Sequence, residues 1–331
     1  MPWDWTPDTR ARLASYLEDR GVTSGEITTT PIGDGHSNLT HLVSDGVHQV
    51  VVRRPPPPPF PPGAHDVLRE ARVINALATT PVPVARLLAT AQAGEVVDVP
   101  LYVMSFAAGP VVTTETPSSL QPARQRIGEA LVDTLADLHA VDWRSAGLEG
   151  YGRPEGFNDR HRRRIAQLVA DDNSQFAELD AWLAEQVPTE SGASIVHNDY
   201  RIGNVVLSAK RPGELVAVLD WELATLGDPL LDLGYFLASV PDDDGPLTPT
   251  QQLGRAMLEP GYPTRKELAD RYAVRTGAEL KNLNWYTTLA LWKLAVLYEY
   301  SRRQGQDPYY ADLAHVQSFL AAAQRAAELE V

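Results

Sequence analysis

The hydrophobic pattern of this 331-residue chain changes character near residue 106. Before that point, short β-prone runs alternate with turns over residues 26 to 53, and two further runs lie near Val84 to Thr90 and Val99 to Phe106. Residues 64 to 78 instead carry apolar side chains at helical spacing. The N-terminal part is therefore predicted to form a five-stranded sheet with one helix.

Helical periodicity dominates the rest of the chain, apart from a hairpin predicted at residues 194 to 220. The predicted helices span residues 120 to 141, 158 to 187, 230 to 239, 264 to 276, 283 to 303 and 310 to 329. The pattern indicates an α+β protein with two lobes. A small β-rich lobe at 1–106 precedes a larger, mainly helical lobe at 107–331, with a hinge near Ala107 to Pro110.

Composition excludes several functional classes. The net charge of −14 argues against nucleic acid or an anionic membrane as the main partner, because both bind basic surfaces. The absence of cysteine excludes disulfides and cysteine nucleophiles. The longest apolar stretch, residues 289 to 298, is far shorter than the roughly 20 residues that span a bilayer, and no secretory signal is visible. We expect a cytoplasmic protein with no membrane partner.

The segment from residue 195 to 220, IVHNDYRIGNVVLSAKRPGELVAVLD, carries the main chemical signal. It delivers His197 and Asp199 into a loop, places Asn204 five residues after Asp199, and ends two apolar strands at Asp220. Phosphoryl transfer needs a carboxylate that accepts a proton from the attacking hydroxyl, and oxygen ligands that hold Mg²⁺ on the polyphosphate. We therefore predict Asp199 as the catalytic base, with Asn204 and Asp220 as metal ligands.

This spacing resembles the protein-kinase catalytic loop H-R-D-L-x-x-x-N, followed by a metal-binding Asp. Tyr200 replaces the Leu, and Asp220-Trp221-Glu222 replaces D-F-G. With LATLGDPLLDLGYF downstream, nearly the whole chain resembles the aminoglycoside phosphotransferase and choline kinase family, in the branch fused to some acyl-CoA dehydrogenases. The resemblance implies a protein-kinase-like fold. It also implies transfer of the γ-phosphoryl group of ATP or GTP to a small-molecule hydroxyl, on an aminoglycoside-like compound, an amino alcohol or a hydroxyacyl compound.

The N-terminal lobe carries candidates for nucleotide binding. A glycine-bearing loop with Gly33, Gly35 and Ser37 is predicted to cover the phosphates, although a plain hairpin turn also explains it. The run VVVR places Arg53 where kinases have the phosphate-binding Lys, and Glu70 is its expected ion-pair partner. Arg54 would replace Arg53 only if the strand register slipped by one residue.

The adenine slot is expected to be lined by apolar side chains that include Met104, Val206 and Leu219, which core packing would also explain. Backbone groups of Ser105 and Ala107 are expected to hydrogen-bond the base.

Three further residues near the motif have two interpretations each. Arg201 either steadies the transferring phosphate or forms an ion pair with a nearby carboxylate such as Asp228 or Asp232. His197 is either a metal ligand or base, or a structural residue whose buried ring hydrogen-bonds the backbone near Asp220, and we predict the structural role. Glu222 is either a water-mediated neighbour of the metal or a surface acid.

The acceptor is the least constrained part of the prediction. An anionic acceptor would use the basic run at residues 160 to 164, which is otherwise a solvated helix face. A cationic acceptor would instead use acidic residues such as Glu299 and Asp232. Alternatives to a small-molecule kinase are a nucleotide-binding pseudokinase, which Arg53 leaves open, a protein kinase, and a metal-dependent hydrolase using His139, His197, Asp199 and Asp220. The oligomeric state is not predicted.

Overall fold

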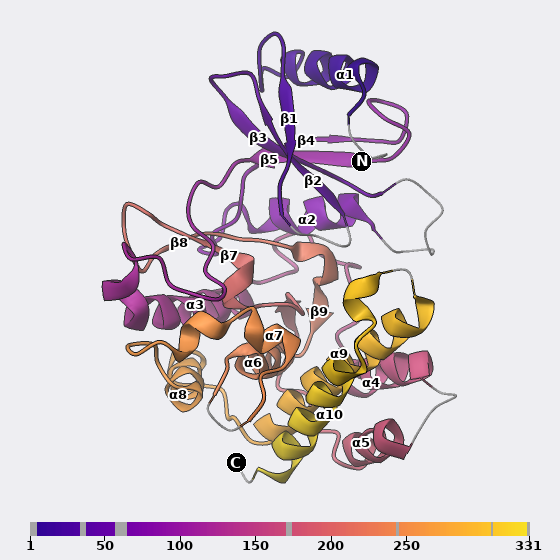
Figure 1. Ribbon diagram of the computed structural model, residues 1–331, viewed down its shortest axis with the longest axis vertical. Helices are drawn as coiled ribbons and strands as arrows, with labels where there is room; N and C mark the ends of the chain where they lie inside the picture. The colour runs from indigo at the N-terminus through magenta and orange to yellow at the C-terminus, as the bar shows by residue number, and fades with distance from the viewer. Residues whose placement is uncertain are drawn as a thin grey trace. The chain divides into compact units, whose positions relative to one another are not determined.

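The computed structural model describes residues 5–33, 38–56, 65–169, 174–242, 245–305 and 307–329. The chain forms two compact units (Figure 1). The smaller unit comprises Met1–Ala108 and Ala217–Glu222, and the larger unit comprises Gly109–Val216 and Leu223–Val331. The segment that carries Asp220 therefore belongs to the smaller unit, although it follows the catalytic-loop motif in the sequence.

The smaller unit contains the predicted five-stranded sheet, in the order β1-β2-β3-β5-β4 and antiparallel throughout. The strands are β1 Thr28–Pro31, β2 Leu39–Ser44, β3 Gln49–Arg54, β4 Leu87–Ala91 and β5 Leu101–Ser105. In this register Thr40 of β2 lies opposite Arg53 of β3. Side chains alternate between the two faces of a strand, so Arg53 and Arg54 point to opposite faces.

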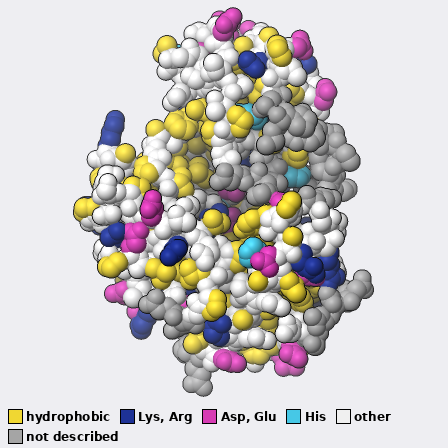
Figure 2. Space-filling view, viewed as in Figure 1, with side chains coloured by type: hydrophobic (Ala, Val, Ile, Leu, Met, Phe, Trp, Pro, Cys, Tyr) yellow, Lys and Arg dark blue, Asp and Glu magenta, His cyan; other side chains and the backbone are white. Residues whose placement is uncertain are grey.

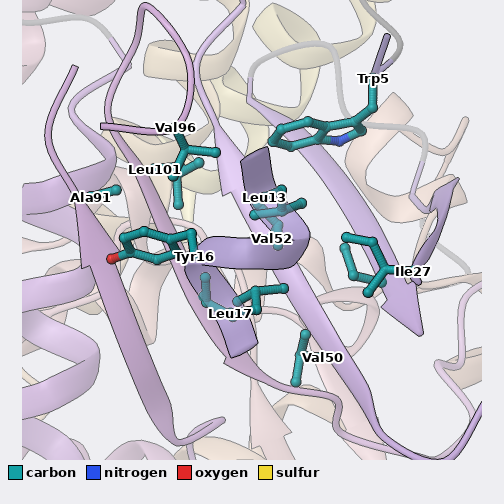
Figure 3. Close-up of a cluster of buried hydrophobic side chains, with 12 residues drawn as sticks. Trp5, Leu13, Tyr16, Leu17, Ile27, Val50, Val52, Ala91, Val96 and Leu101 are labelled. Atoms are coloured by element: carbon teal, nitrogen blue, oxygen red, sulfur yellow. The ribbon is translucent and has the colours of Figure 1, made fainter. Parts of the chain in front are cut away.

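Helix α1, Pro7–Glu18, covers one face of this sheet, and the sequence analysis did not predict it. The helix begins after Thr6, whose side chain accepts a hydrogen bond from the Thr9 amide at 3.2 Å. A capping Thr followed by Pro is a recognised helix-start signal that could have revealed it. Its buried side chains pack against apolar strand residues (Figure 3); the labelled cluster includes Leu13, Tyr16, Leu17, Val50, Val52 and Leu101.

Helix α2, Val67–Leu77, lies on the opposite face and matches the helix predicted in the N-terminal part. Val50 and Val52 point toward α1, so Arg53 points toward α2 by strand alternation. Arg54 lies on the α1 side, with its guanidinium 5.0 Å from the centre of the Trp5 ring. The register therefore excludes Arg54 as a substitute for Arg53.

The larger unit is mainly helical, as predicted. Its helices are α3 Arg124–His139, α4 Phe157–Ala166, α5 Ser174–Glu185, α6 Pro229–Ser239, α7 Pro249–Gln252, α8 Arg265–Thr276, α9 Leu283–Gln304 and α10 Leu313–Glu328. The single helix predicted at residues 158 to 187 is two helices, α4 and α5. Helix α9 packs against α6 and α10. Two indole N–H groups of α9 donate to carbonyls of α5, one from Trp285 to Leu183 and one from Trp292 to Phe176.

Two small antiparallel sheets frame the segment with the chemical signal. Strand β6, Ser194–Val196, pairs with β9, Thr225–Gly227, and this pairing holds the start of the loop that carries Asp199. Strand β7, Val205–Leu207, forms a hairpin with β8, Leu215–Val218, which is shorter than the hairpin predicted at residues 194 to 220 because β6 pairs with β9.

The distribution of surface charge and the hydrophobicity of the helices bear on the partners that the composition argues against. On the face in Figure 2, most described acidic and basic side chains lie singly among apolar and neutral ones, and one group of basic side chains lies near the right edge. Among the described residues, no helix combines the length and the apolar character that crossing a membrane requires.

Candidate active site

The loop after β6 is held by a carboxylate from helix α6. Asp232 is fully buried, and its two oxygens accept the backbone N–H groups of His197 at 2.5 Å and Asn198 at 2.6 Å. Asn198 has a φ of 66°, a left-handed conformation that non-glycine residues adopt rarely. These bonds fix the backbone immediately before Asp199.

The Asp199 carboxylate receives hydrogen bonds at both oxygens. The hydroxyl of Tyr235 donates to Oδ1, and the side-chain amide of Asn204 donates to Oδ2 at 2.8 Å. The same amide also donates to the Asp199 carbonyl at 2.8 Å, which closes the loop on itself. The Asp199 side chain is 20% exposed, so the carboxylate is oriented and still accessible.

Arg201 forms an ion pair, but with neither of the predicted partners. Its Nε lies 3.5 Å from Oδ1 of Asp199. Asp228 instead caps α6 and binds Tyr286 and Asn158, whereas Asp232 binds the loop backbone. An ion pair with a nearby carboxylate is thus present, and the two carboxylates named as examples are engaged by the helix cap and by the loop.

His197 is fully buried, and its Nδ1 accepts the backbone N–H of Asp199 at 3.2 Å. His139 contacts the hydroxyl of Tyr272 at 2.6 Å and Asp232 at 3.4 Å. Both histidines therefore support the loop, and these contacts favour a structural role over the hydrolase alternative.

In the smaller unit, the Arg53 guanidinium is shared by three carboxylates. Nε donates to Glu70 at 3.0 Å, and Nη2 donates to Asp220 at 2.7 Å and Glu222 at 3.0 Å. Nη1 also donates to Thr40 at 3.2 Å, across the pairing of β2 and β3. The expected ion pair between Arg53 and Glu70 is thus present, and Glu222 is part of the same cluster.

The charges of this cluster are unbalanced. Burial raises the pKa of Glu70 to about 7, against the attraction of Arg53 and with the repulsion of Asp220. Burial works to lower the pKa of Arg53, but the carboxylates around it, with Glu70 the largest influence, raise it. When ionised, three carboxylates around one guanidinium leave an excess of two negative charges. A divalent cation would neutralise that excess.

The donor set suits Mg²⁺ bound together with a polyphosphate. Asp220 is 34% exposed and Glu222 is 24% exposed, so their oxygens can be reached. Asp220 has a φ of 62°, which turns the backbone sharply at this residue. Among the described residues, no three His, Asp or Glu side chains gather as a complete metal site. Mg²⁺ often takes only one or two protein carboxylates and completes its coordination with phosphate and water.

Several predicted nucleotide contacts can be located. Gly33 has a φ of 79°, which favours glycine, whereas Gly35 and Ser37 lie outside the described residues. The backbone N–H of Ser105 donates to the Arg86 carbonyl at 2.9 Å, so only the Ser105 carbonyl stays a candidate for binding the base. The apolar candidates range from half-buried to buried: Met104 on β5, Leu219 before Asp220, and Val206 on β7.

Gly109 was not singled out by the sequence analysis. A Cβ at this position would lie 2.0 Å from the backbone carbonyl oxygen of Leu207 and 2.8 Å from a methyl group of Val206. The backbone after Ala108 therefore passes directly against β7, and only glycine fits. A lone glycine before a proline gave no signal of such close packing.

The residues proposed for acceptor binding are largely engaged elsewhere. Arg162 is buried and pairs with Asp159 and Asp180, and Arg160 donates to backbone carbonyls that include that of Gly156. Glu299 is buried and pairs with arginines of its own helix, as Asp232 is buried under the loop. Neither the basic run as a whole nor this acidic pair forms an open acceptor site.

Together, a five-stranded sheet with a buried Arg–Glu pair and a helical unit with an Asp–Asn loop define the class of protein-kinase-like phosphotransferases. A family model described as "Phosphotransferase enzyme family" matches residues 28–268, and the chain belongs to this family.

Known proteins of several kinds resemble the chain. Human acyl-CoA dehydrogenase family member 11 is 32% identical over 292 residues, which cover 86% of this chain and 36% of that protein. The chain thus spans about a third of this relative. The crystal structure of a candidate aminoglycoside phosphotransferase from Ralstonia eutropha JMP134 has a TM-score of 0.77 and 27% identity, covering 96% of this chain and 95% of that one. Choline kinase from Cryptosporidium parvum Iowa II has a TM-score of 0.62 and 13% identity, covering 95% and 94%.

Proposed function

We propose that this protein is a small-molecule kinase that transfers the γ-phosphoryl group of ATP or GTP to an alcohol, with Asp199 as the base. One observation carries the proposal: both oxygens of Asp199 are held by neutral donors, Tyr235 and Asn204, while the side chain stays accessible. A carboxylate oriented in this way can accept a hydroxyl proton in the transition state.

In this proposal the residues have separate roles. Arg53, oriented by Glu70, binds phosphate oxygens of the nucleotide. Asp220 and Asn204 hold Mg²⁺, which neutralises charge on the polyphosphate, and Glu222 is a further oxygen donor near Asp220. Arg201 stabilises charge on the transferred group when it leaves Asp199.

The acceptor is proposed to be a small molecule. The relative named as an acyl-CoA dehydrogenase family member favours hydroxyacyl compounds, and the phosphotransferase and choline kinase likenesses favour aminoglycosides and amino alcohols. Each class carries a hydroxyl that Asp199 could deprotonate.

A screen of nucleotide consumption tests this function. Purified protein with Mg²⁺ and either ATP or GTP is offered hydroxyacyl-CoAs, aminoglycosides, amino alcohols and sugars, and phosphorylated product is detected by mass spectrometry. Asp199→Asn should lower turnover by about a hundredfold or more while nucleotide affinity is kept. Asp270→Asn, at an exposed residue paired with Lys266, is the matched control and should behave as wild type. Wild-type turnover in Asp199→Asn would remove this residue from the mechanism.

A second candidate is a nucleotide-binding regulatory module without transfer activity. The ion pair of Arg53 with Asp220 favours it, because that contact engages one oxygen of a proposed metal ligand. Nucleotide binding by calorimetry without any phosphorylated product in the screen would support this alternative.

A further inference from the structure

Two buried side chains lie close to Asp199 or to the residue before it. The mechanism predicted from the sequence gives neither of them a role. The first is Tyr235 of α6, whose hydroxyl donates to Oδ1 of Asp199. Burial, followed by the charge of Asp199, raises the pKa of the Tyr235 phenol well above its usual range. The hydroxyl therefore stays protonated at neutral pH and acts as a permanent donor to the carboxylate.

The second is Lys293 of α9, which is 7% exposed. Its Nζ donates to the Asn198 carbonyl at 3.2 Å and lies 4.9 Å from the centre of the Tyr235 ring. Among the described residues it forms no direct ion pair with a carboxylate. Burial of an ammonium group without a carboxylate partner is unfavourable for folding. Buried charges of this kind are often found at functional sites.

Lys293 completes a clamp on the residue before Asp199. The Asn198 amide N–H binds Asp232, its side-chain amide donates to the Leu223 carbonyl at 3.0 Å, and its own carbonyl accepts from Lys293. A residue in a left-handed conformation persists only when its surroundings hold it from several sides. The clamp thus sets the direction in which the chain enters Asp199.

The two helices that carry this pair pack too closely to slide. A Cβ at Gly234 of α6 would lie 2.7 Å from backbone and Cβ atoms of Tyr286 on α9. Tyr235, next to Gly234, lies on the face of α6 that approaches α9, and its ring is 4.9 Å from Lys293 Nζ. The cavity between them has a volume of about 10 Å³, and Asn198 and His161 also line it. That space has room for roughly one water molecule.

We propose that Tyr235 and Lys293 form one positioning unit for the catalytic base. Tyr235 fixes the Asp199 carboxylate through Oδ1, and Lys293 fixes the Asn198 carbonyl and the face of the Tyr235 ring. Neither side chain touches the substrates; both act through Asp199. This inference rests on the proposed function of Asp199 as the base.

Kinetics test the positioning role. Turnover of Mg·ATP is followed as ADP release, with the acceptor that the screen identifies and with water alone. Tyr235→Phe and Lys293→Met should each lower kcat by about 10- to 100-fold with the KM for Mg·ATP within about twofold, because only transition-state geometry is lost. Wild-type kcat in Tyr235→Phe, or a raised KM with unchanged kcat, would overturn the proposal.

Thermal unfolding separates positioning from a merely structural role. Lys293→Met keeps the length of the side chain and removes a buried charge, so its Tm should equal or exceed that of wild type while kcat falls. Tyr286→Phe is the matched control, because it removes a buried phenol that donates to Asp228 at 2.6 Å on the same cavity wall. It should lower the Tm and leave kcat within about threefold. A lower Tm and a normal kcat in Lys293→Met would contradict the inference.

A double-mutant cycle covers the case in which wild type shows no turnover. Asp199→Ala and Tyr235→Phe, each of which removes the hydrogen bond, are compared singly and together by urea unfolding. Because the two side chains share a hydrogen bond, their effects on stability should not be additive. Additive effects would refute the contact on which the inference depends. Absence of ADP release in wild type, with coupling intact, would instead overturn the proposed function and the catalytic purpose of the pair.

Discussion

Arg53 and Glu70 are separated by 17 positions in the sequence and form a buried ion pair with 3.0 Å between Nε and Oε2. The pair joins β3 to α2 on one face of the sheet. It leaves Nη2 of Arg53 directed at Asp220 and Glu222, so one guanidinium connects the helix to the proposed metal ligands. Loss of Glu70 should therefore alter both stability and nucleotide binding.

The stability of the protein should depend on the ionisation of Glu70. Because burial raises the folded-state pKa of Glu70 to about 7 from 4.5, the folded state holds a proton that the unfolded state releases. This contribution is fully present below pH 4.5 and is lost as the pH rises through about 7. Relative to Glu70→Gln, wild type should lose on the order of 1–3 kcal/mol across this window, measured by urea unfolding at several pH values. Parallel pH profiles of the two proteins would contradict the prediction.

Arg53 and Glu70 should act as one unit in nucleotide binding. Arg53→Ala should raise the KM for the nucleotide and lower kcat, and Glu70→Ala should do the same more weakly because it frees the Arg53 side chain. The double variant should then be no worse than Arg53→Ala. Strict additivity of the two effects in steady-state kinetics would show that the pair does not work as a unit.

Asp220 should couple nucleotide affinity to Mg²⁺. Asp220→Asn keeps the shape of the side chain and removes the charge, so Mg²⁺-dependent binding of ATP should weaken by about tenfold or more. Isothermal titration with and without Mg²⁺ measures this dependence. Asp98→Asn, at an exposed residue of the same unit, is the control and should titrate as wild type. Unchanged Mg²⁺ dependence in Asp220→Asn would exclude Asp220 as a ligand.

The close approach at Gly109 should make this position intolerant of any side chain. Gly109→Ala places a Cβ against the Leu207 carbonyl oxygen, so the free energy of unfolding should fall by about 2 kcal/mol or more. Gly192→Ala meets nothing within 4 Å and should change it by less than about 0.5 kcal/mol. Equal stabilities of the two variants in urea unfolding would contradict this packing.

Charge reversal in the basic run at residues 160 to 164 should lower the free energy of unfolding at the buried Arg162 and leave it nearly unchanged at the exposed Arg164. Arg162→Glu places a negative charge beside Asp159 and Asp180 and should lower stability by about 2 kcal/mol or more. Arg164→Glu, at an exposed residue of the same helix, should be nearly neutral. A stable Arg162→Glu variant with weakened acceptor binding would restore the anion-subsite hypothesis.

Local patterns were sufficient to predict the main elements. Alternating and helical periodicities predicted the sheet strands, α2 and the long helices, because each element buries one face and its sequence repeats accordingly. The spacing of Asp199, Asn204 and Asp220 indicated the chemistry, since a loop and a hairpin of fixed length connect these residues. The short capped helix α1 was missed, although its start signal at Thr6 was present.

Only the tertiary structure decided which polar side chains meet. Glu70 lies off the apolar stripe of α2 and is nevertheless buried, because it forms an ion pair with Arg53 on a strand distant in the sequence. In the sequence, Tyr235 and Lys293 have no feature that separates them from other residues of apolar helices. Their contact with each other, next to Asp199, depends on how α6 packs against α9. Sequence alone determined the elements and the spacing of the motif, because both are local. The partners of buried charges depend on contacts between residues far apart in the chain, which no local pattern records.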